Sequence, residues 1–114
     1  MKILKILTIL GTRPEIIRLS KVIKLLDKQV DHKLVHTGQN YDFELNQIFF
    51  NDLGIKKPKY ELSISRNKSA VEAISTILIK VEKIFIKEKP DAIIVLGDTN
   101  SCLSAYVAKR LKIP

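Results

Sequence analysis

The chain has 114 residues, of which 46% are hydrophobic and 28% charged, so it can form one small globular domain and is not a disordered chain. One cysteine and two histidines exclude a disulfide framework, a cysteine-based zinc site and a histidine-rich metal centre. The formal net charge is +8, and 16 of the 20 basic residues are lysines spread along the whole chain. Proteins that recognise nucleic-acid phosphates cluster their cations and often use arginine, so this pattern favours a solvated basic surface over a nucleic-acid partner.

The first predicted elements are a buried strand and an amphipathic helix. Residues 3–10 form an apolar run that ends at Gly11, as in a strand buried on both faces. Lys5 interrupts the run, which is also too short to span a bilayer, so we expect a cytoplasmic protein without a membrane partner. A helix begins with Thr12 as N-cap and continues to about Lys28. Its apolar side chains at helical spacing are Ile16, Leu19, Val22, Ile23 and Leu26.

A second strand and a long connection follow. Residues 33–36 form the strand, and a shorter amphipathic segment surrounds Leu45, Ile48 and Phe49. Residues 51–65, which include Gly54 and Pro58, are expected to be a connector.

The longest predicted helix begins at a capping box formed by Ser69 and Glu72. It runs to about Glu88, and Pro90 with Asp91 stops it. Its inward side chains are expected to be Ile74, Ile77, Leu78, Val81 and Phe85.

The remaining residues complete an alternating pattern of strands and helices. Residues 92–96 form a third buried strand, residues 100–111 a last helix, and residues 112–114 the approach to a fourth strand. Alternation with glycine at each strand exit predicts an α/β protein with a Rossmann-like parallel sheet. Three strands make about half of a doubly wound domain, so we expect residues 1–114 to be the N-terminal part of the first Rossmann-like domain of a longer protein.

Polar motifs follow all three predicted strands: GTRPE (11–15), HTGQNYD (36–42) and LGDTNS (96–101). In open α/β sheets, ligands bind beyond the carboxyl ends of the strands. The first motif places Arg13 at a helix N-terminus, which suits a phosphate group, although a capped turn with a surface arginine fits as well. Arg18 lies one helical turn beyond Pro14 and could face the same site.

The other two motifs carry further candidates. Asp98 directly follows an apolar strand, where a carboxylate can act as acid, base or ribose partner, but where a helix N-cap is the commoner role. Gln39 can contact a polar ligand or take part in an ordinary turn. His36 is expected to be structural and Cys102 a small buried hydrophobe. The sequence has neither GxGxxG nor GxxxxGK[ST], so no dinucleotide cofactor and no P-loop ATP chemistry are predicted.

Together the three motifs, in this order on consecutive strand exits, closely resemble the non-hydrolysing UDP-N-acetylglucosamine 2-epimerase family over the whole chain. Within it, HTGQNYD…ELNQIFFNDLGI and LGDTNSC are most similar to the branch that makes UDP-N-acetyl-L-fucosamine for capsule or O-antigen. The resemblance implies two Rossmann-like domains in a glycosyltransferase-B arrangement, a UDP-sugar bound between them and a homodimer. It implies no cofactor and no metal.

The resemblance also implies a mechanism and a set of site residues. UDP is eliminated to leave a 2-acetamidoglycal and is then added back, with the proton delivered to the other face. By motif position Asp98 matches the catalytic aspartate and Arg13 a substrate-binding arginine, while Arg18 stands where many members have lysine. The other acid and base groups belong to segments beyond Pro114, so this chain alone is expected to be inactive. The expected substrate-binding set also includes Gly11, Thr12, Pro14, Gln39 and Thr99.

Two other functions stay open at this point. A hydrolysing epimerase would release free UDP, and a non-catalytic module would bind a sugar nucleotide or a nucleic acid, as the net charge of +8 suggests. Family members that are activated at a second site generally read QHR where this chain has Gln39, Asn40 and Tyr41, so no allosteric activation is predicted.

Overall fold

The computed structural model describes residues 3–11, 13–37, 54–55, 58–62, 69–96 and 100–114. Its centre is one four-stranded sheet in the order β3-β2-β1-β4, in which every neighbouring pair is parallel. The predicted α/β class with a Rossmann-like parallel sheet is therefore confirmed. The strands are β1 (Lys5–Leu10), β2 (Asp31–His36), β3 (Tyr60–Glu61) and β4 (Ala92–Ile94).

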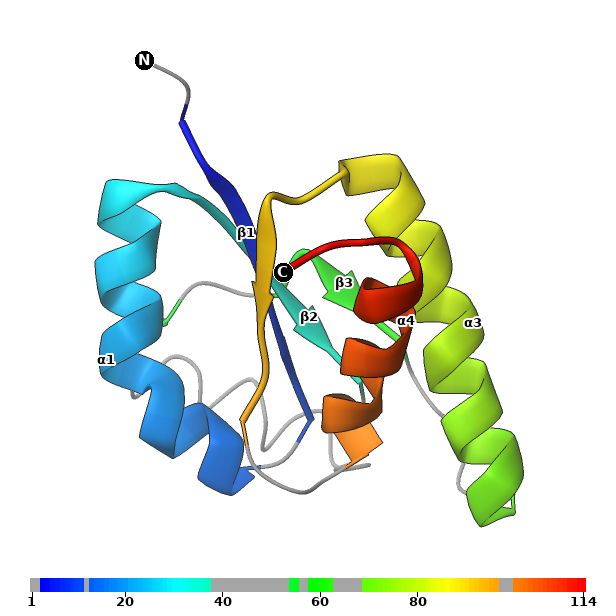
Figure 1. Ribbon diagram of the computed structural model, residues 1–114. Coiled ribbons are helices and arrows are strands. Elements are labelled where there is room, and N and C mark those ends of the chain that lie inside the picture. The colour runs from blue at the N-terminus through cyan, green and yellow to red at the C-terminus, as the bar shows by residue number, and fades with distance from the viewer. Residues whose placement is uncertain (1–2, 12, 38–53, 56–57, 63–68, 97–99) are drawn as a thin grey trace.

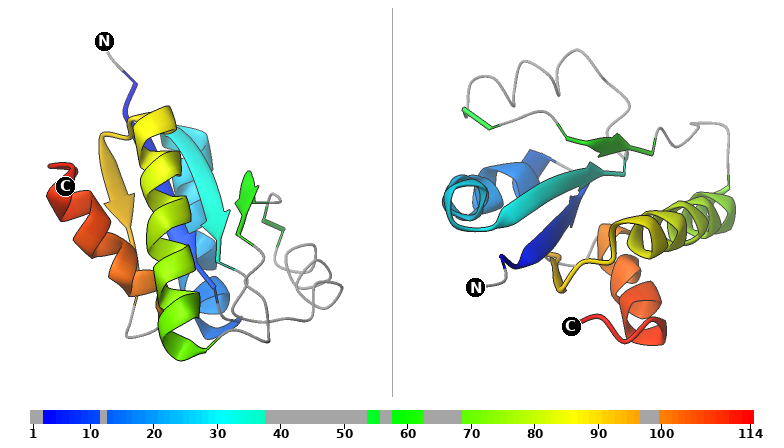
Figure 2. Two further views of the ribbon diagram at one scale, coloured as in Figure 1. Left: turned by 90° about the vertical axis from the view of Figure 1, so that its right-hand side faces the viewer. Right: turned by 90° about the horizontal axis from the view of Figure 1, so that it is seen from above.

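Helices cover both faces of this sheet (Figure 1). Helix α1 (Arg13–Gln29) connects β1 to β2 and packs on one face. Helix α3 (Ala70–Glu88) precedes β4, and a 3-10 turn, η1 (Asn100–Leu103), leads into α4 (Ser104–Arg110). Figure 2 shows α3 and α4 together on the opposite face from α1. This three-layer arrangement is the one expected for parallel strands joined by helical crossovers.

The predicted elements differ from the structure mainly at the sheet edges. β3 lies inside the segment that was predicted to be a connector, because two residues are too few to show a strand pattern. β4 is shorter than the predicted strand and only half-buried, since it lies at the edge of the described sheet. The amphipathic segment around Leu45, Ile48 and Phe49 lies outside the described residues.

Helix α3 has the start that the capping box predicted. The Ser69 hydroxyl accepts a hydrogen bond from the backbone N–H of Glu72 at 3.1 Å. At the other end Lys89 adopts a left-handed conformation (φ 50°), and its N–H donates to the carbonyl of Phe85. This is a standard way to end a helix, and it turns the chain toward Pro90 and β4.

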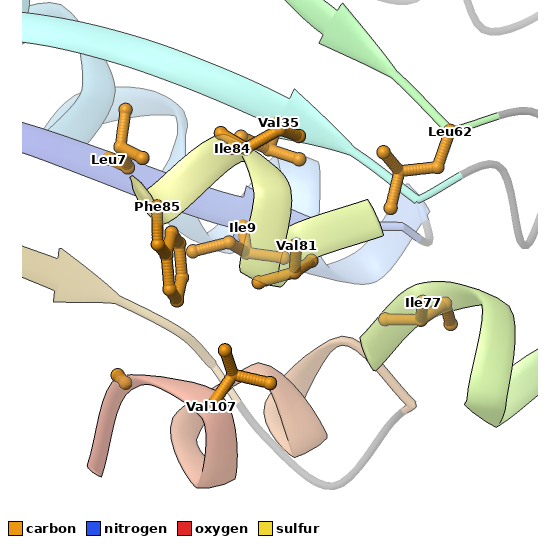
Figure 3. Packing of buried hydrophobic residues seen from close by; sticks show 10 residues of the cluster. Leu7, Ile9, Val35, Leu62, Ile77, Val81, Ile84, Phe85 and Val107 are labelled. Carbon is orange, nitrogen blue, oxygen red and sulfur yellow. The ribbon is translucent and has the colours of Figure 1, made fainter. Parts of the chain in front are cut away.

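The apolar core lies in two layers, one on each face of the sheet. The larger layer joins β1 and β2 to α3 and α4, and Figure 3 shows Leu7 and Ile9 of β1 facing the same layer as Val81 and Phe85 of α3. The smaller layer joins the other face of the sheet to α1 through Ile16, Leu19 and Ile23, among others. Val22, one of the apolar residues at helical spacing, is 41% exposed, because it lies just outside the stripe of α1 that faces the sheet.

A buried polar chain connects α1 to the sheet. The carboxylate of Asp27 lies 2.7 Å from Nδ1 of His32, and Nε2 of His32 lies 2.7 Å from the hydroxyl of Thr8. The His32 side chain is fully buried, so both ring nitrogens depend on these two partners. Since a carboxylate can only accept, Nδ1 carries the proton that is donated to Asp27.

Replacing Asp27 by alanine is expected to destabilise the protein by about 1–3 kcal/mol, because one N–H of His32 then stays buried without its acceptor. The change is measured as the difference in the free energy of urea unfolding. Gln29→Ala, an exposed change on the same helix, serves as the control. Equal unfolding curves for the two variants would contradict this role of Asp27.

The last described residues return to the sheet. The N–H of Ile93 in β4 donates to the carbonyl of Pro114 at 2.9 Å, as the prediction of a segment approaching the sheet requires. Within the described part of the chain, no helix is long and apolar enough to cross a membrane.

Candidate functional site

Three strands of the sheet end at one level. Leu10 of β1 pairs with His36 of β2, which in turn pairs with Glu61 of β3. The pairing continues past the strand ends, because the N–H of Thr37 donates to the Leu10 carbonyl at 2.8 Å and that of Leu62 donates to the His36 carbonyl at 2.9 Å. The first two polar motifs of the sequence therefore leave the sheet side by side, at the carboxyl edge where ligands of such sheets bind.

Two helical segments begin at this same edge (Figure 1). Helix α1 begins at Arg13, two residues after the buried Gly11, and η1 begins at Asn100. The first N–H groups of a helix have no partner within the helix, and with the helix dipole they favour a negative charge. The start of α1 therefore gives this edge backbone N–H groups that favour a negatively charged ligand.

The predicted site residues fall into three groups: those that the structure describes, those of which it describes only the backbone, and those outside the described residues. Gly11 is buried at the end of β1, and Arg18 is exposed on the second turn of α1. Arg13 and Pro14 form the first turn of α1, but their side chains are outside the described set. The structure thus joins the exit of β1, the start of α1 and the exit of β2. The predicted site residues that lie outside the described residues are Thr12, Gln39, Asp98 and Thr99.

His36 is a buried, neutral histidine at this edge. Only 4% of it is exposed, and burial lowers its pKa from 6.5 to about 4. The expectation that His36 is structural agrees with this burial. At neutral pH the imidazole adds no charge beside the start of α1.

The burial of His36 predicts a pH effect on stability. The unfolded chain binds a proton near pH 6.5 whereas the folded chain does so only near pH 4, so stability falls as the pH drops between these values, by up to about 3 kcal/mol. In the His36→Gln variant this part of the pH dependence should disappear. Urea unfolding at pH 7 and pH 4.5 measures it, and an unchanged pH slope in the variant would refute the assignment.

Cys102 does not behave as predicted. It is half-buried rather than buried, and its thiol lies 3.2 Å from the carbonyl of Leu96, to which it can donate. The cause is its position in η1, a tight turn whose side chains do not follow the α-helical period that the sequence suggested.

A second group of titratable side chains lies toward the amino ends of the strands. The carboxylate of Glu88, at the end of α3, is 5% exposed and accepts from Lys33 at 2.9 Å and Lys59 at 3.1 Å. The hydroxyl of Tyr60 donates to the same carboxylate, and Lys5 completes the group at 3.5 Å. One helix residue is therefore bound to β1, β2 and β3 and to the residue before β3.

The pKa shifts of Glu88, Lys33 and Tyr60 in this Glu88 cluster all follow from the same hydrogen bonds. Burial alone would raise the pKa of Glu88, but hydrogen bonds from Tyr60, Lys33 and Lys59 outweigh it and hold that pKa far below its ordinary value. The hydrogen bond to Glu88 raises the pKa of Lys33, and it also raises the pKa of Tyr60. Every group has a partner here, which indicates a structural cluster rather than a reactive one.

The cluster was not predicted, because its lysines are far apart in the sequence. The even spread of lysines was interpreted as a solvated surface, yet three of them meet at one buried carboxylate. A lone glutamate at a helix end gives no signal of this in the sequence. Among the residues that the structure describes, no group of three or more histidine, cysteine, aspartate or glutamate side chains could hold a metal ion.

Comparisons with known proteins identify a family for this chain. The family model described as UDP-N-acetylglucosamine 2-epimerase matches residues 24–114. The chain is 55% identical to a solved UDP-N-acetylglucosamine 2-epimerase from Rickettsia bellii, with a TM-score of 0.88, covering 99% of this chain and 30% of that one. It is 46% identical to the enzyme of that name from Methanocaldococcus jannaschii, solved with UDP-GlcNAc and UDP, with a TM-score of 0.87, covering 96% and 30% of the two chains.

A further relative has a different substrate in its name. The chain is 41% identical over 114 residues to the UDP-2,3-diacetamido-2,3-dideoxy-D-glucuronate 2-epimerase of Pseudomonas aeruginosa, covering 97% of this chain and 32% of that protein. In each comparison the chain spans about a third of the relative's length. The match nevertheless extends over nearly all of the chain, with the same parallel sheet. The chain belongs to the UDP-N-acetylglucosamine 2-epimerase family.

Proposed function

We propose that the protein containing this chain is a non-hydrolysing 2-epimerase of a UDP-N-acetylhexosamine, and that the chain supplies part of the sugar-nucleotide site. The observation that carries the proposal is the likeness to the Methanocaldococcus jannaschii enzyme, at 46% identity and a TM-score of 0.87, whose structure holds UDP-GlcNAc and UDP. Ligands of open α/β sheets bind at the carboxyl ends of the strands. The start of α1 at this edge supports placing the sugar-nucleotide site there.

The chemistry to be performed explains the residue types in the motifs. The hydrogen on C2 of the sugar has no neighbouring carbonyl, so its simple removal and return is unfavourable. A base removes this proton while the bond from C1 to the UDP oxygen breaks, which leaves a C1=C2 double bond and free UDP. UDP then attacks C1 again, and an acid delivers a proton to the opposite face of C2.

The roles within this chain follow from position. We assign the departing diphosphate to the amino end of α1 with Arg13 and Arg18, where backbone N–H groups and guanidinium donors can take up the developing charge. Asp98 is assigned to proton transfer, and Gly11, Thr12, Pro14, Gln39 and Thr99 to substrate contact. We assign the remaining catalytic groups to segments beyond Pro114, in a protein with two Rossmann-like domains in a glycosyltransferase-B arrangement.

The identity of the sugar has three candidates. UDP-GlcNAc, with UDP-ManNAc as product, follows from the family and the complexes of relatives. A diacetamido-glucuronate is favoured by the 41% identity to the Pseudomonas aeruginosa enzyme. The residues of the second and third motifs favour C2 epimerisation that gives UDP-N-acetyl-L-fucosamine. Each product is a building block of the kind used in surface polysaccharides.

The test uses the full-length protein with each of the three UDP-sugars in turn. Proton and phosphorus NMR follow the sugar configuration and the fate of UDP. We expect one UDP-sugar to reach an equilibrium with its C2 epimer while the total UDP-sugar stays constant. Steady accumulation of free UDP and free sugar would instead identify a hydrolysing epimerase, and no conversion of any of the three would refute the proposal.

A further inference from the structure

Helix α1 runs from one end of the strands to the other (Figure 1). It begins at Arg13, at the edge where the sugar-nucleotide site is proposed, and a single residue, Val30, connects its end to β2. With a rise of 1.5 Å per residue, this helix is a stiff rod about 25 Å long. Whatever holds the last turn of α1 against the sheet therefore also decides where its first turn lies.

Most of the contact between α1 and the sheet is apolar. Ile16, Leu19 and Ile23 lie in one buried cluster with apolar residues of β1 and β2. Hydrophobic contacts are non-directional, so they favour burial of this face of α1 but restrict small shifts along or about the helix axis only weakly. A more directional contact is needed to fix the start of α1 in one place.

The buried polar chain of Asp27, His32 and Thr8 supplies such a contact. Asp27 lies in the last turn of α1, His32 is the second residue of β2, and Thr8 lies in β1. Each of the two hydrogen bonds measures 2.7 Å, the His32 side chain is fully buried, and only 1% of Thr8 is exposed. One side chain from each of three elements thus takes part in the chain.

Hydrogen bonds restrict both distance and angle, and a buried set in which every group has a partner specifies one arrangement of the elements that carry it. The short connection through Val30 limits how far the end of α1 can move from β2. The bond from His32 to Asp27 adds a second attachment, on the side of the helix that faces the sheet. Two attachments at one end fix the direction of the rod as well as its position.

We propose that this polar chain positions the start of α1 for the diphosphate of the UDP-sugar. Asp27 and Thr8 are then positioning residues, which act on the site through the helix, about 20 Å from its first turn. Misplacement of a binding group by about 1 Å can cost as much as 100-fold in rate, so a small tilt of α1 is enough to matter. The inference rests on the proposed function, because it requires the diphosphate at this helix end.

The test measures the affinity of the full-length protein for UDP, which is common to all three candidate sugars. Titration calorimetry is done at a temperature where circular dichroism shows each variant to be folded. Asp27→Ala and Thr8→Val should each bind UDP about tenfold more weakly, because each removes one hydrogen bond of the chain. Thr8→Ser keeps the hydroxyl and should bind UDP as the unaltered protein does.

The matched control is Val81→Ala. Val81 is fully buried in the apolar layer on the opposite face of the sheet, so this variant loses stability through a cavity without a change at α1. Its affinity for UDP should be unchanged, which separates positioning from a general loss of stability. If Asp27→Ala does not fold, the comparison of Thr8→Val with Thr8→Ser carries the test.

Three results would overturn the inference while leaving the proposed function intact. Asp27→Ala and Thr8→Val could bind UDP as tightly as the unaltered protein, which would make the polar chain a source of stability only. Val81→Ala could weaken UDP binding as much as they do, or Thr8→Ser as much as Thr8→Val. Failure of the unaltered full-length protein to bind UDP would instead refute the proposed function, and this inference with it.

Discussion

Replacing Asp98 by asparagine is expected to slow C2 epimerisation about 100- to 10,000-fold, which is the usual contribution of a positioned acid or base. Asparagine keeps the size and most hydrogen-bonding capacity of the side chain but cannot exchange a proton. The KM for the UDP-sugar should change little, because the diphosphate is assigned to α1 and the two arginines. Steady-state kinetics of the full-length protein measure both constants.

This variant separates the two roles that the sequence allows for Asp98. If Asp98 serves only as a helix N-cap, asparagine is nearly as good a cap, so both activity and stability would be kept. A matched control is Asp31→Asn, which changes an exposed aspartate at the amino end of β2, at the opposite end of the strands from the proposed site. Normal epimerisation by the Asp98 variant would contradict the catalytic assignment.

Replacing Glu88 by glutamine is expected to destabilise the protein by about 2–4 kcal/mol. The carboxylate is 5% exposed and accepts from Lys33, Lys59 and Tyr60, so the neutral amide leaves the half-buried Lys33 and the more exposed Lys59 without their counter-charge. The loss should be most evident at β3, whose two residues have few other contacts with the sheet. Urea unfolding at pH 7 measures the change in free energy.

The pH dependence of this effect has a definite sign. The pKa of Glu88 is lower in the folded than in the unfolded protein, so its contribution is complete above about pH 5 and is lost as the pH falls below the unfolded value. The gap between variant and unaltered protein should therefore narrow in acid. Glu82→Gln, an exposed glutamate on the same helix, is the control. If the two variants unfold alike at pH 7, Glu88 does not hold the cluster together.

The sequence was sufficient for the elements with a clear period. β1 shows as an apolar run and β2 as a short strand around Leu34 and Val35, each followed by a glycine motif. α3 shows as a long amphipathic stretch with a side-chain cap, because one face of it must be buried. β3 could not be predicted, since its two residues belong to the sheet only through pairing with β2. The Glu88 cluster and the hydrogen bonds that join Asp27, His32 and Thr8 could not be predicted for the same reason, because they depend on residues from different parts of the sequence.

The candidate site was predictable to the level of its location. Strand exits are marked by short polar motifs, and parallel strands bring such exits to one edge, as the exits of β1 and β2 show. Which side chains meet there depends on loop conformation, for which the sequence carries no period. The roles of Arg13, Gln39 and Asp98 therefore stay predictions.

The most direct test of the proposed epimerase function is incubation of the full-length protein with its UDP-sugar in D2O. Elimination and re-addition of UDP must break the bond between C2 and hydrogen in every turnover. The proposal therefore predicts deuterium at C2 in both epimers, seen as loss of the C2 proton signal and a mass increase of about one unit. Retention of the original proton at C2 during epimerisation, or no exchange with any of the three sugars, would contradict it.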